Sequence, residues 1–427
     1  MSLNTIAYVG LTHLGLISAA AALEKGFKVI CFDRNQELVA NLKSGKYPIN
    51  EPGFKEAMEK RKDRVYFTSC PEDLKKAELL YVAPDIPTND SGVSDLQGIK
   101  ELISFIIPSL SKSSCLIVLS QVPPGFTRAL SQEIQEPLRV YYQVETLVFG
   151  IAMQRALYPE RFIVGTQNKN IPLDPNFETF LKAFNCPILV MDYESAEFCK
   201  ICINAFLAAT VSTTNTLEEI CQKIGAKWRD IVPALRLDKR IGEYAYLAPG
   251  LGLSGGNIER DLKTITSLAE CHGSHGQVVD SFIKNSQHRR NWPLNTFYKK
   301  VYPQFSEKPL TLCVLGIAYK ENTHSTKNSA SLRLLAQLKN FEIQAYDPLV
   351  KSLPFEHGSI TIKDSALEAV KGADVLFLMT PWDEFKDLQL EDLLSIMRER
   401  FIIDPYKILS MDSDVAFKQN VTYYSLC

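Results

Sequence analysis

The sequence predicts an α/β protein with two doubly wound domains, each built on a mostly parallel sheet, and a helical segment between them. Short β-rich runs alternate with helical runs at the start of the chain and again after about residue 308. Between about Tyr193 and Asn285 the apolar residues follow a helical period instead. Because strands that alternate with helices form βαβ units, each flanking block is expected to bury a parallel sheet between helices.

The expected elements of the first block are a helix from about Leu16 to Lys25 and strands at Ile6–Val9, Lys28–Phe32, Leu79–Val82, Cys115–Leu119 and Phe162–Val164. Those of the last block are a helix at Ala330–Leu338 and strands at Leu310–Leu315, Ile343–Tyr346 and Val375–Met379. The helix that opens the middle block is apolar on more than one face over residues 195–207, so we expect it to be buried between domains or subunits. The predicted domains are residues 1–190, 191–290 and 291–427.

The composition is that of an ordinary globular protein. The 427 residues include 47 Lys and Arg against 49 Asp and Glu, so no summed positive charge favours nucleic acid or an anionic membrane. No run approaches the roughly 20 consecutive apolar residues of a membrane span, and the first residues do not have the pattern of a secretory signal. We therefore expect a cytoplasmic protein that binds a small molecule and binds neither nucleic acid nor a membrane.

Cysteine spacing gives no sign of a metal site. The sequence has 10 cysteines, and its only close pair, Cys199 and Cys202, lies within a helical pattern with no second pair at metal-ligand spacing. We expect unlinked and mostly buried thiols.

A glycine-containing turn follows the first expected strand. Gly10, Thr12 and Gly15 form a G-x-T-x-x-G variant of the dinucleotide-binding sequence, in which glycines permit a tight turn, close approach of the pyrophosphate and close helix packing. The Thr12 side chain replaces the middle glycine and crowds the place where the backbone should meet the pyrophosphate. On its own, therefore, this match is a weak signal.

An acid at the end of the second strand strengthens the interpretation. Asp33 lies 18 residues after Gly15, where an acid accepts hydrogen bonds from the adenosine ribose. The next residue, Arg34, could instead meet a 2′-phosphate, but the carboxylate would repel that group, so NAD is preferred to NADP. The alternative is a glycine turn and a solvated acid in a doubly wound fold that binds no nucleotide.

Several segments in the same order resemble the UDP-glucose/GDP-mannose dehydrogenase family over nearly the whole chain. They are residues 44–53, Asp95–Leu96, Val122–Gly125, Glu197–Ala208, Arg240–Gly242, Pro249–Asp261, Gly316–Lys320, Tyr346–Pro348 and Trp382–Phe385. The resemblance implies an N-terminal NAD domain, a 6-phosphogluconate-dehydrogenase-like central domain with a dimerisation helix, and a C-terminal nucleotide-sugar domain. It also implies oxidation of a sugar C6 alcohol through two hydride transfers to NAD, for the supply of polysaccharide precursors.

The resemblance assigns catalytic roles to four residues. Lys200 and Asn204 match a helix pair that acts on the developing oxyanion, and their i, i+4 spacing places both on one helix face. Asp261 matches an acid that handles protons and water, and Glu145 is the most plausible match for a second one. The alternatives are a solvated polar stripe for the helix pair and an ordinary surface carboxylate for Glu145.

Further contacts are implied for the cofactor and the substrate. The expected cofactor contacts are Gly10, Thr12, Gly15, Asp33, Arg34, Pro87, Ser120, Gln121 and Lys327. The expected substrate contacts are Arg240, Gly255 and Lys320, of which Arg240 would reach the nucleotide sugar of a neighbouring subunit in a homodimer. Surface exposure without function is the alternative for each of these cations.

The main departure from the family concerns its nucleophile. The family uses a Cys thiolate that attacks the intermediate aldehyde, and Asn257 stands at that position. No cysteine lies between Cys221 and Cys271, and an amide is not a competent nucleophile, so the thioester route is closed. Other departures are Gln121, His324, Ser325, Lys327 and Asp404-Pro405-Tyr406, the last of which leaves the base and the sugar undefined.

The resulting hypothesis is a UDP-glucose 6-dehydrogenase-like enzyme that binds NAD and a nucleoside-diphosphate sugar. Asn257 leaves two outcomes: release of the 6-aldehyde after one hydride transfer, or oxidation of the aldehyde hydrate without a covalent intermediate. A non-catalytic protein that binds the nucleotide sugar or NAD is one alternative. A dehydrogenase of a different hydroxy substrate on the same scaffold is another.

Overall fold

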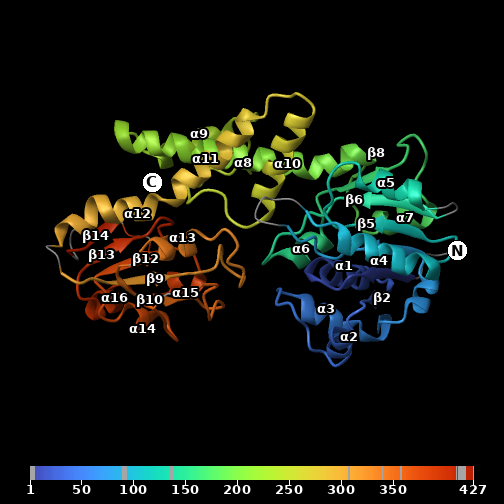
Figure 1. Ribbon diagram of the computed structural model, residues 1–427, viewed down its shortest axis with the longest axis horizontal. Helices are drawn as coiled ribbons and strands as arrows, with labels where there is room; N and C mark the ends of the chain where they lie inside the picture. Colours follow the sequence, from blue (N-terminus) through green and yellow to red (C-terminus); the bar gives the residue numbers. More distant parts are fainter. Residues whose placement is uncertain are drawn as a thin grey trace. The chain divides into compact units, whose positions relative to one another are not determined.

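The computed structural model contains two sheets and a set of helices between them in the chain (Figure 1). It describes residues 5–88, 94–134, 138–305, 308–338, 340–355, 358–409, 411 and 420–426. The chain divides into two compact units, Met1–Ile203 and Asn204–Cys427. The predicted fold class, two Rossmann-like α/β parts with a helical region between them, is confirmed, while the three predicted domain boundaries remain a prediction.

The first unit is built on an eight-stranded sheet with the order β3-β2-β1-β4-β5-β6-β7-β8. Neighbouring strands are parallel except β6 and β7, which are antiparallel. The strands are β1 Thr5–Val9, β2 Lys28–Phe32, β3 Val65–Thr68, β4 Leu79–Val82, β5 Cys115–Val118, β6 Arg139–Gln143, β7 Phe162–Thr166 and β8 Ile188–Asp192.

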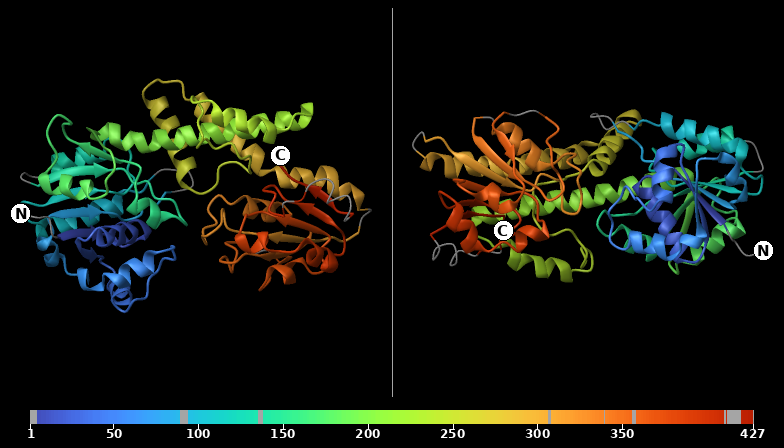
Figure 2. Two further views of the ribbon diagram at one scale, coloured as in Figure 1. Left: turned by 180° about the vertical axis from the view of Figure 1, so that it is seen from behind. Right: turned by 90° about the horizontal axis from the view of Figure 1, so that it is seen from below.

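Helices cover both faces of this sheet (Figure 2). Alternate residues of β1 enter different cores: Ile6 and Tyr8 pack on one face, and Ala7 and Val9 pack on the other. The helices are α1 His13–Glu24, α2 Gln36–Lys43, α3 Phe54–Lys60, α4 Gln97–Ile106, α5 Phe126–Glu133, α6 Ala152–Leu157 and α7 Pro175–Lys182. Short 3₁₀ turns occupy Lys62–Arg64, Pro71–Lys76 and Ile107–Ser109.

A 32-residue helix, α8 Tyr193–Ile224, begins in the first unit and ends in the second. It is the one described helix that is long and apolar enough, by length and composition, to cross a membrane. The same length and composition occur in core helices of soluble proteins, and α8 carries six buried polar side chains: Glu197, Asn204, Ser212, Thr214, Asn215 and Glu218. The helix nevertheless contains no unbroken run of 20 apolar residues.

The helices that follow α8 form the first part of the second unit. They are α9 Trp228–Leu237, α10 Asn257–Cys271, α11 Gln277–Arg290 and α12 Trp292–Thr296, followed by a π-helical turn, Phe297–Val301, and a 3₁₀ turn, Tyr302–Gln304. Leu253 and Leu262 pack with Ala208 of α8 and Val279 of α11 in a small apolar cluster. The predicted helical block between the two sheets is therefore present.

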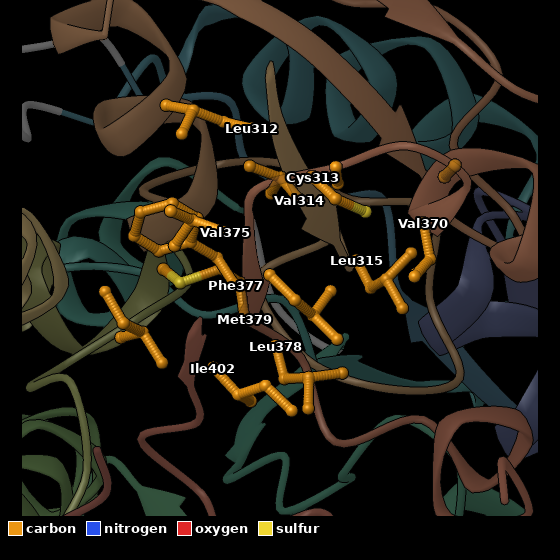
Figure 3. Packing of buried hydrophobic residues seen from close by; sticks show 14 of the residues in the cluster. Leu312, Cys313, Val314, Leu315, Val370, Val375, Phe377, Leu378, Met379 and Ile402 are labelled. Atoms are coloured by element: carbon orange, nitrogen blue, oxygen red, sulfur yellow. The ribbon is translucent and has the colours of Figure 1, made fainter. Parts of the chain in front are cut away.

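The second sheet has six parallel strands in the order β11-β10-β9-β12-β13-β14. The strands are β9 Thr311–Leu315, β10 Glu342–Tyr346, β11 Ile360–Ile362, β12 Val375–Leu378, β13 Phe401–Ile403 and β14 Thr422–Tyr424. The helices are α13 Ala330–Gln337, α14 Ala366–Val370, α15 Asp383–Lys386 and α16 Leu390–Ile396. Its central strands β9 and β12 are completely buried at Val314, Leu315 and Phe377, where they pack with Ile402 of β13 (Figure 3).

The sequence-based elements agree with the structure to within a few residues. The largest shift is at α1, which begins at His13 rather than at about Leu16, because Thr12 acts as the N-cap residue and the glycine turn leads straight into the helix.

All nine described cysteines are free thiols, as expected, but only four of them are buried: Cys31, Cys115, Cys221 and Cys313.

A buried carboxylate closes the turn after β9. Asp347 is completely buried, and its oxygens accept the backbone N–H groups of Ile317 and Ala318 at 2.7 and 2.9 Å and those of Leu349 and Val350 at 2.9 Å each. The indole N–H of Trp382 donates to the same side chain at 3.2 Å. One acid therefore joins the ends of β9 and β10 to the segment after β12.

Replacement of Asp347 by alanine is expected to destabilise the second unit strongly. It would leave several buried N–H groups without an acceptor, each at a cost of about 1–3 kcal/mol, so a loss of roughly 3 kcal/mol or more is expected. The measurement is urea unfolding of Asp347→Ala followed by fluorescence. The exposed Asp364 provides the matched control Asp364→Ala, which should change stability by less than about 0.5 kcal/mol. Equal stabilities of the two variants would contradict the role given to Asp347.

Candidate functional site

The turn between β1 and α1 requires glycine at two positions. Gly10 has a φ of +88°, and a Cβ there would lie 2.7 Å from the backbone nitrogen of Pro84. A Cβ on Gly15 would lie 2.1 Å from the carbonyl oxygen of Gly10, so the helix can approach the turn this closely only without a side chain. The two glycines thus allow the turn to pack against the segment after β4 and allow α1 to approach the turn closely, as in dinucleotide-binding turns.

The Thr12 side chain is directed away from the backbone of this turn. Its hydroxyl lies within donating distance of the carbonyl oxygen of Ala83, at 3.1 Å, and of the Asp85 carboxylate, at 3.2 Å, both in the segment after β4. The predicted crowding by Thr12 is therefore reduced, since the hydroxyl is held against the neighbouring strand end.

Asp33 lies at the carboxyl end of β2, beside the glycine turn. One carboxylate oxygen accepts the N–H of Leu11 at 2.8 Å, and the other accepts the N–H of Asn35 at 2.9 Å. Asp33 is only partly buried, and a carboxylate has about four acceptor positions, so capacity remains for two ribose hydroxyl groups. The residues of this turn therefore fit a dinucleotide with an unmodified ribose.

The other cofactor residues predicted in the first unit have different surroundings. Ser120 is buried and donates its hydroxyl to the Pro84 carbonyl oxygen at 2.5 Å, which ties the end of β5 to the end of β4. Pro87 is exposed in the segment after β4, and Gln121 follows Ser120 and is partly buried. The exposed Arg34 guanidinium lies over the ring of Phe105 at 5.0 Å.

Glu145 and Lys200 form an ion pair within the first unit. The Lys200 Nζ lies 3.6 Å from a Glu145 carboxylate oxygen, and both side chains are largely buried, with 13% and 17% of their surfaces exposed. Glu145 follows β6 and also accepts the backbone N–H of Leu147. It borders a cavity of about 60 Å³ whose lining includes Tyr8 and Gln143. The ion pair with Lys200 holds Glu145 in one position, which is unlike an ordinary surface carboxylate.

The role of Glu197 was not predicted from the sequence, although its segment was singled out. Glu197 is completely buried on α8 and accepts the N–H groups of Gly125 and Thr127, at 2.6 and 2.8 Å, at the start of α5. Burial raises the pKa of its carboxyl group, and the bonds to these residues oppose that rise. Glu197 therefore attaches the first turn of α8, which also carries Lys200, to the sheet of the first unit.

In the second unit, Asn204 and Asp261 are joined directly. The Asn204 amide Nδ2 donates to one Asp261 oxygen at 2.5 Å, and the Arg260 Nε donates to the other at 3.1 Å. All three side chains are buried. The Nη2 atom of Arg260 is also buried and has no hydrogen-bond partner among the residues that the structure describes. Sequence reasoning did not identify Arg260, because a cation next to a carboxylate in the chain is common on helices.

The glycine-containing loop before α10 carries the next group of predicted residues. Gly255 has a φ of +78°, and a Cβ there would lie 3.1 Å from the ring of Tyr319. A Cβ on Gly256 would lie 2.8 Å from the Lys327 side chain. Asn257 is the first residue of α10 and is exposed, so its side chain stands at the positive end of the helix dipole.

Polar side chains from two other helices hold this loop in place. The Asn215 carboxamide oxygen on α8 accepts the Gly250 N–H at 2.9 Å, and the Ser286 hydroxyl on α11 accepts the Leu253 N–H at 2.8 Å. Arg289 donates to the Gly250 carbonyl oxygen at 3.3 Å and forms a buried ion pair with Glu218 at 2.7 Å. The loop conformation is therefore fixed by interactions that do not involve Asn257.

The predicted cations of the second unit, Lys320 and Arg240 for the substrate and Lys327 for the cofactor, lie near its surface. Lys320 is partly buried with its Nζ 5.9 Å from the Tyr319 ring, and Lys327 is exposed next to Gly256. Arg240 is 89% exposed in the turn after α9, where Asp238 accepts two hydrogen bonds from its guanidinium at 2.9 and 2.6 Å. This pairing with Asp238 raises the pKa of Arg240.

The departures seen in the sequence have clear positions in the second unit. His324 is exposed, and Asp404 is completely buried, where it accepts N–H groups of Tyr406 and Leu409 and the Tyr423 hydroxyl. Burial raises the pKa of Asp404. Within the described ranges no group of three His, Cys, Asp or Glu side chains could hold a metal ion.

The two glycine turns of the chain differ in one respect that matters for dinucleotide binding. Gly316 after β9 has a φ of +93° and corresponds in the fold to Gly10. The acid at the end of the next strand is only partly buried at Asp33, but Asp347 is completely buried and already accepts five hydrogen bonds. The second turn is therefore occupied by its own carboxylate, and the first turn is the one open to a dinucleotide.

Comparisons with known proteins agree with this geometry. Residues 4–175, 194–287 and 313–411 match the NAD binding domain, the central domain and the UDP binding domain of the UDP-glucose/GDP-mannose dehydrogenase family. The UDP-glucose 6-dehydrogenase TuaD of Bacillus subtilis (strain 168) is 26% identical over 96% of this chain and 90% of the relative. A UDP-glucose 6-dehydrogenase of Rickettsia conorii is also 26% identical, over 99% of both chains.

Solved structures show the same fold. The UDP-D-ManNAc dehydrogenase from Pyrococcus horikoshii superposes with a TM-score of 0.84 at 20% identity, covering 99% of both chains. The UDP-glucose dehydrogenase from Pyrobaculum islandicum superposes with a TM-score of 0.81 at 22% identity, covering 94% of both chains. Three matched domains in order and full-length relatives show that this chain belongs to the UDP-glucose/GDP-mannose dehydrogenase family of oxidoreductases, whose members use NAD, and contains the family's NAD-binding domain.

Proposed function

We propose that the protein oxidises a nucleoside-diphosphate sugar at its C6 alcohol with NAD as the hydride acceptor, and that UDP-glucose is the first substrate to test. The observation that carries the proposal is the buried Asn204–Asp261 pair, since a buried amide and acid are costly unless they serve each other or a ligand. The UDP binding domain and the names of the UDP-glucose dehydrogenase relatives favour a UDP-sugar.

For the first oxidation, we propose that Lys200 and Asn204 donate to the C6 oxygen. They are one turn apart on α8, so both can direct donors to one oxygen. Asp261 would accept the proton of the hydroxyl. NAD, held at the turn of Gly10 and Gly15 and by Asp33, would supply the acceptor for the hydride of C6. Glu145 holds the Lys200 ammonium in position through their ion pair. The products are an aldehyde, NADH and one proton transferred to the protein.

The second oxidation would have to proceed without a thiolate. Water would add to the aldehyde to give a hydrate, whose carbon could transfer a second hydride to a second molecule of NAD while a carboxylate accepts the hydroxyl proton, leaving the acid. Asn257 is exposed at the first residue of α10 and can offer only amide hydrogen bonds to such a hydrate. If the hydrate does not form in place, the reaction ends at the aldehyde.

The deciding experiment measures NADH formed per sugar consumed with UDP-glucose, UDP-N-acetylhexosamines and GDP-mannose, with products identified by mass. Two NADH per sugar with a uronic acid product supports complete oxidation through the hydrate, and one NADH with an aldehyde supports a single step. Asp261→Ala, purified identically, is the control for contaminating dehydrogenases. Absence of NADH with measurable binding of the sugar nucleotide would support the non-catalytic alternative, and NADH only with a non-nucleotide alcohol would support a different substrate.

Restoring a thiol at position 257 gives a second prediction. Asn257→Cys places a thiol at the N-terminus of a 15-residue helix, where the dipole lowers thiol pKa values and favours the thiolate. We expect a new or faster second phase of NADH formation in stopped-flow traces, while Asn257→Ala shows none. A folded Asn257→Cys protein that binds substrate without any gain would mean that position 257 does not occupy the nucleophile's place.

We also propose a homodimer that associates through α8. Phe206, Leu217, Ile220 and Ile224 are exposed, with 42 to 78% of their surfaces accessible, and their spacing of 11, 14 and 18 residues from Phe206 places them on one face. Exposed apolar side chains on one helix face are typical of an interface. The buried polar groups of α8 favour a protein–protein contact over a membrane, and we propose a cytoplasmic location.

Charge on this stripe should prevent the association. Phe206→Glu is expected to change the sedimentation coefficient of the purified protein from that of a dimer to that of a monomer, because an unpaired carboxylate would be buried at the interface. Glu219→Gln, on the same helix, is the control. A wild-type protein that sediments as a monomer at micromolar concentration, or one that pellets with membranes, would contradict these proposals.

A further inference from the structure

We propose that Glu51 and His13 are positioning residues that couple the cofactor-binding turn to the chain segment that follows Glu145. We call His13, Glu51, Gly150 and Ala152 the Glu51 bridge. This inference rests on the proposed function for its use of NAD, and it assigns to Glu51 a role outside direct contact with cofactor or substrate.

Glu51 is the centre of the bridge. It is 6% exposed, and its carboxylate accepts the N–H of Gly150 at 2.9 and 3.0 Å and the N–H of Ala152 at 3.3 Å. The same carboxylate lies 2.9 Å from the Nε2 atom of His13. Both oxygens are therefore engaged by donors from two segments that are distant in sequence from Glu51 and from each other.

His13 is held on two sides. Its side chain is 16% exposed, Nε2 faces Glu51, and its ring centroid lies 4.3 Å from that of Phe149. Phe149 immediately precedes Gly150, so the same segment contacts His13 through a ring and Glu51 through its backbone. His13 therefore makes two contacts: its Nε2 atom donates to Glu51, and its ring packs against Phe149.

The position of His13 connects the bridge to the cofactor. His13 is the first residue of α1 and follows Thr12, whose neighbours Gly10 and Gly15 shape the turn. The N–H groups of this first helical turn are those that face a pyrophosphate in doubly wound folds. A shift of the His13 backbone would therefore change the geometry of cofactor binding directly.

The other end of the bridge continues from the candidate catalytic segment. Gly150 lies five residues after Glu145. The Nε atom of Arg155 on α6 donates to the carbonyl oxygen of Thr146 at 2.8 Å, which shortens the free length of this loop. Fixing Gly150 and Ala152 on Glu51 thus limits where Glu145 can place its carboxylate relative to Lys200. We infer that one buried carboxylate sets both the cofactor turn and the start of this loop.

The test compares variants that keep the ring or keep the donor. His13→Phe keeps the ring contact with Phe149 and removes the donor, whereas His13→Gln keeps a donor. Glu51→Gln keeps the shape but turns one acceptor oxygen into a donor that faces N–H groups. Binding of NAD to the full-length protein is measured by isothermal titration calorimetry, which needs no turnover, together with the melting temperature.

We expect His13→Phe and Glu51→Gln each to raise the Kd for NAD about tenfold or more, and His13→Gln to restore most of the affinity. The double variant His13→Phe/Glu51→Gln should lose little NAD affinity beyond either single variant, because each substitution alone already breaks the contact between His13 and Glu51. Lys60→Gln, which breaks the surface pair with Glu24, is the control and should bind NAD as the wild type does.

Two results would overturn the inference. The first is a Kd for NAD that stays within twofold of wild type in folded His13→Phe, even if its melting temperature falls. The second is equal loss in His13→Gln and His13→Phe, which would show that the donor is irrelevant. A folded wild-type protein that binds no NAD would remove the proposed function as well, so the wild-type titration separates the two failures.

Discussion

The structure depends on carboxylates that accept backbone N–H groups where parallel strands end and helices begin. A doubly wound fold brings the first turns of several helices to one edge of the sheet, and their N–H groups have no partners within the helix. Glu51 and Glu197 accept such N–H groups at the starts of α6 and α5, with two or more backbone hydrogen bonds each. Asp33 and Asp347 accept backbone N–H groups of the loops that follow β1 and β2, and β9 and β10, respectively. Because a buried carboxylate is stable only when it is well hydrogen-bonded, each of these acids also fixes the loop that it binds.

A carboxylate at the end of a strand has different roles in the two units. At Asp347 the carboxylate is fully saturated and closes the turn, so the second sheet uses the acid for stability. At Asp33 the carboxylate keeps part of its surface exposed, so the first sheet retains an acceptor for a ligand. Burial of the acid, rather than the glycine pattern before it, thus separates a structural turn from a binding turn.

The loop before α10 is held by contacts that do not involve residue 257. Ser286, Asn215 and Arg289 hold residues 250–253 through hydrogen bonds, and the Arg289–Glu218 ion pair behind them is completely buried. None of these contacts involves Asn257, whose side chain is exposed. A substitution at 257 therefore changes the chemistry available at the helix terminus and leaves the support of the loop unchanged. The Asn204–Asp261 pair, in the same unit, is likewise independent of it.

The sequence alone determined the fold class, most strand positions and the glycine turn with its acid, because hydrophobic period, strand length and turn residues are local properties. It also identified Lys200 and Asn204 as neighbours on a helix, since their spacing follows from helical geometry. Only the tertiary structure decided that Glu145 pairs with Lys200, that Asn204 binds Asp261, and that Glu51 joins His13 to Gly150. These contacts join residues 38 to 99 positions apart, and no local pattern records which distant backbone groups a carboxylate will accept.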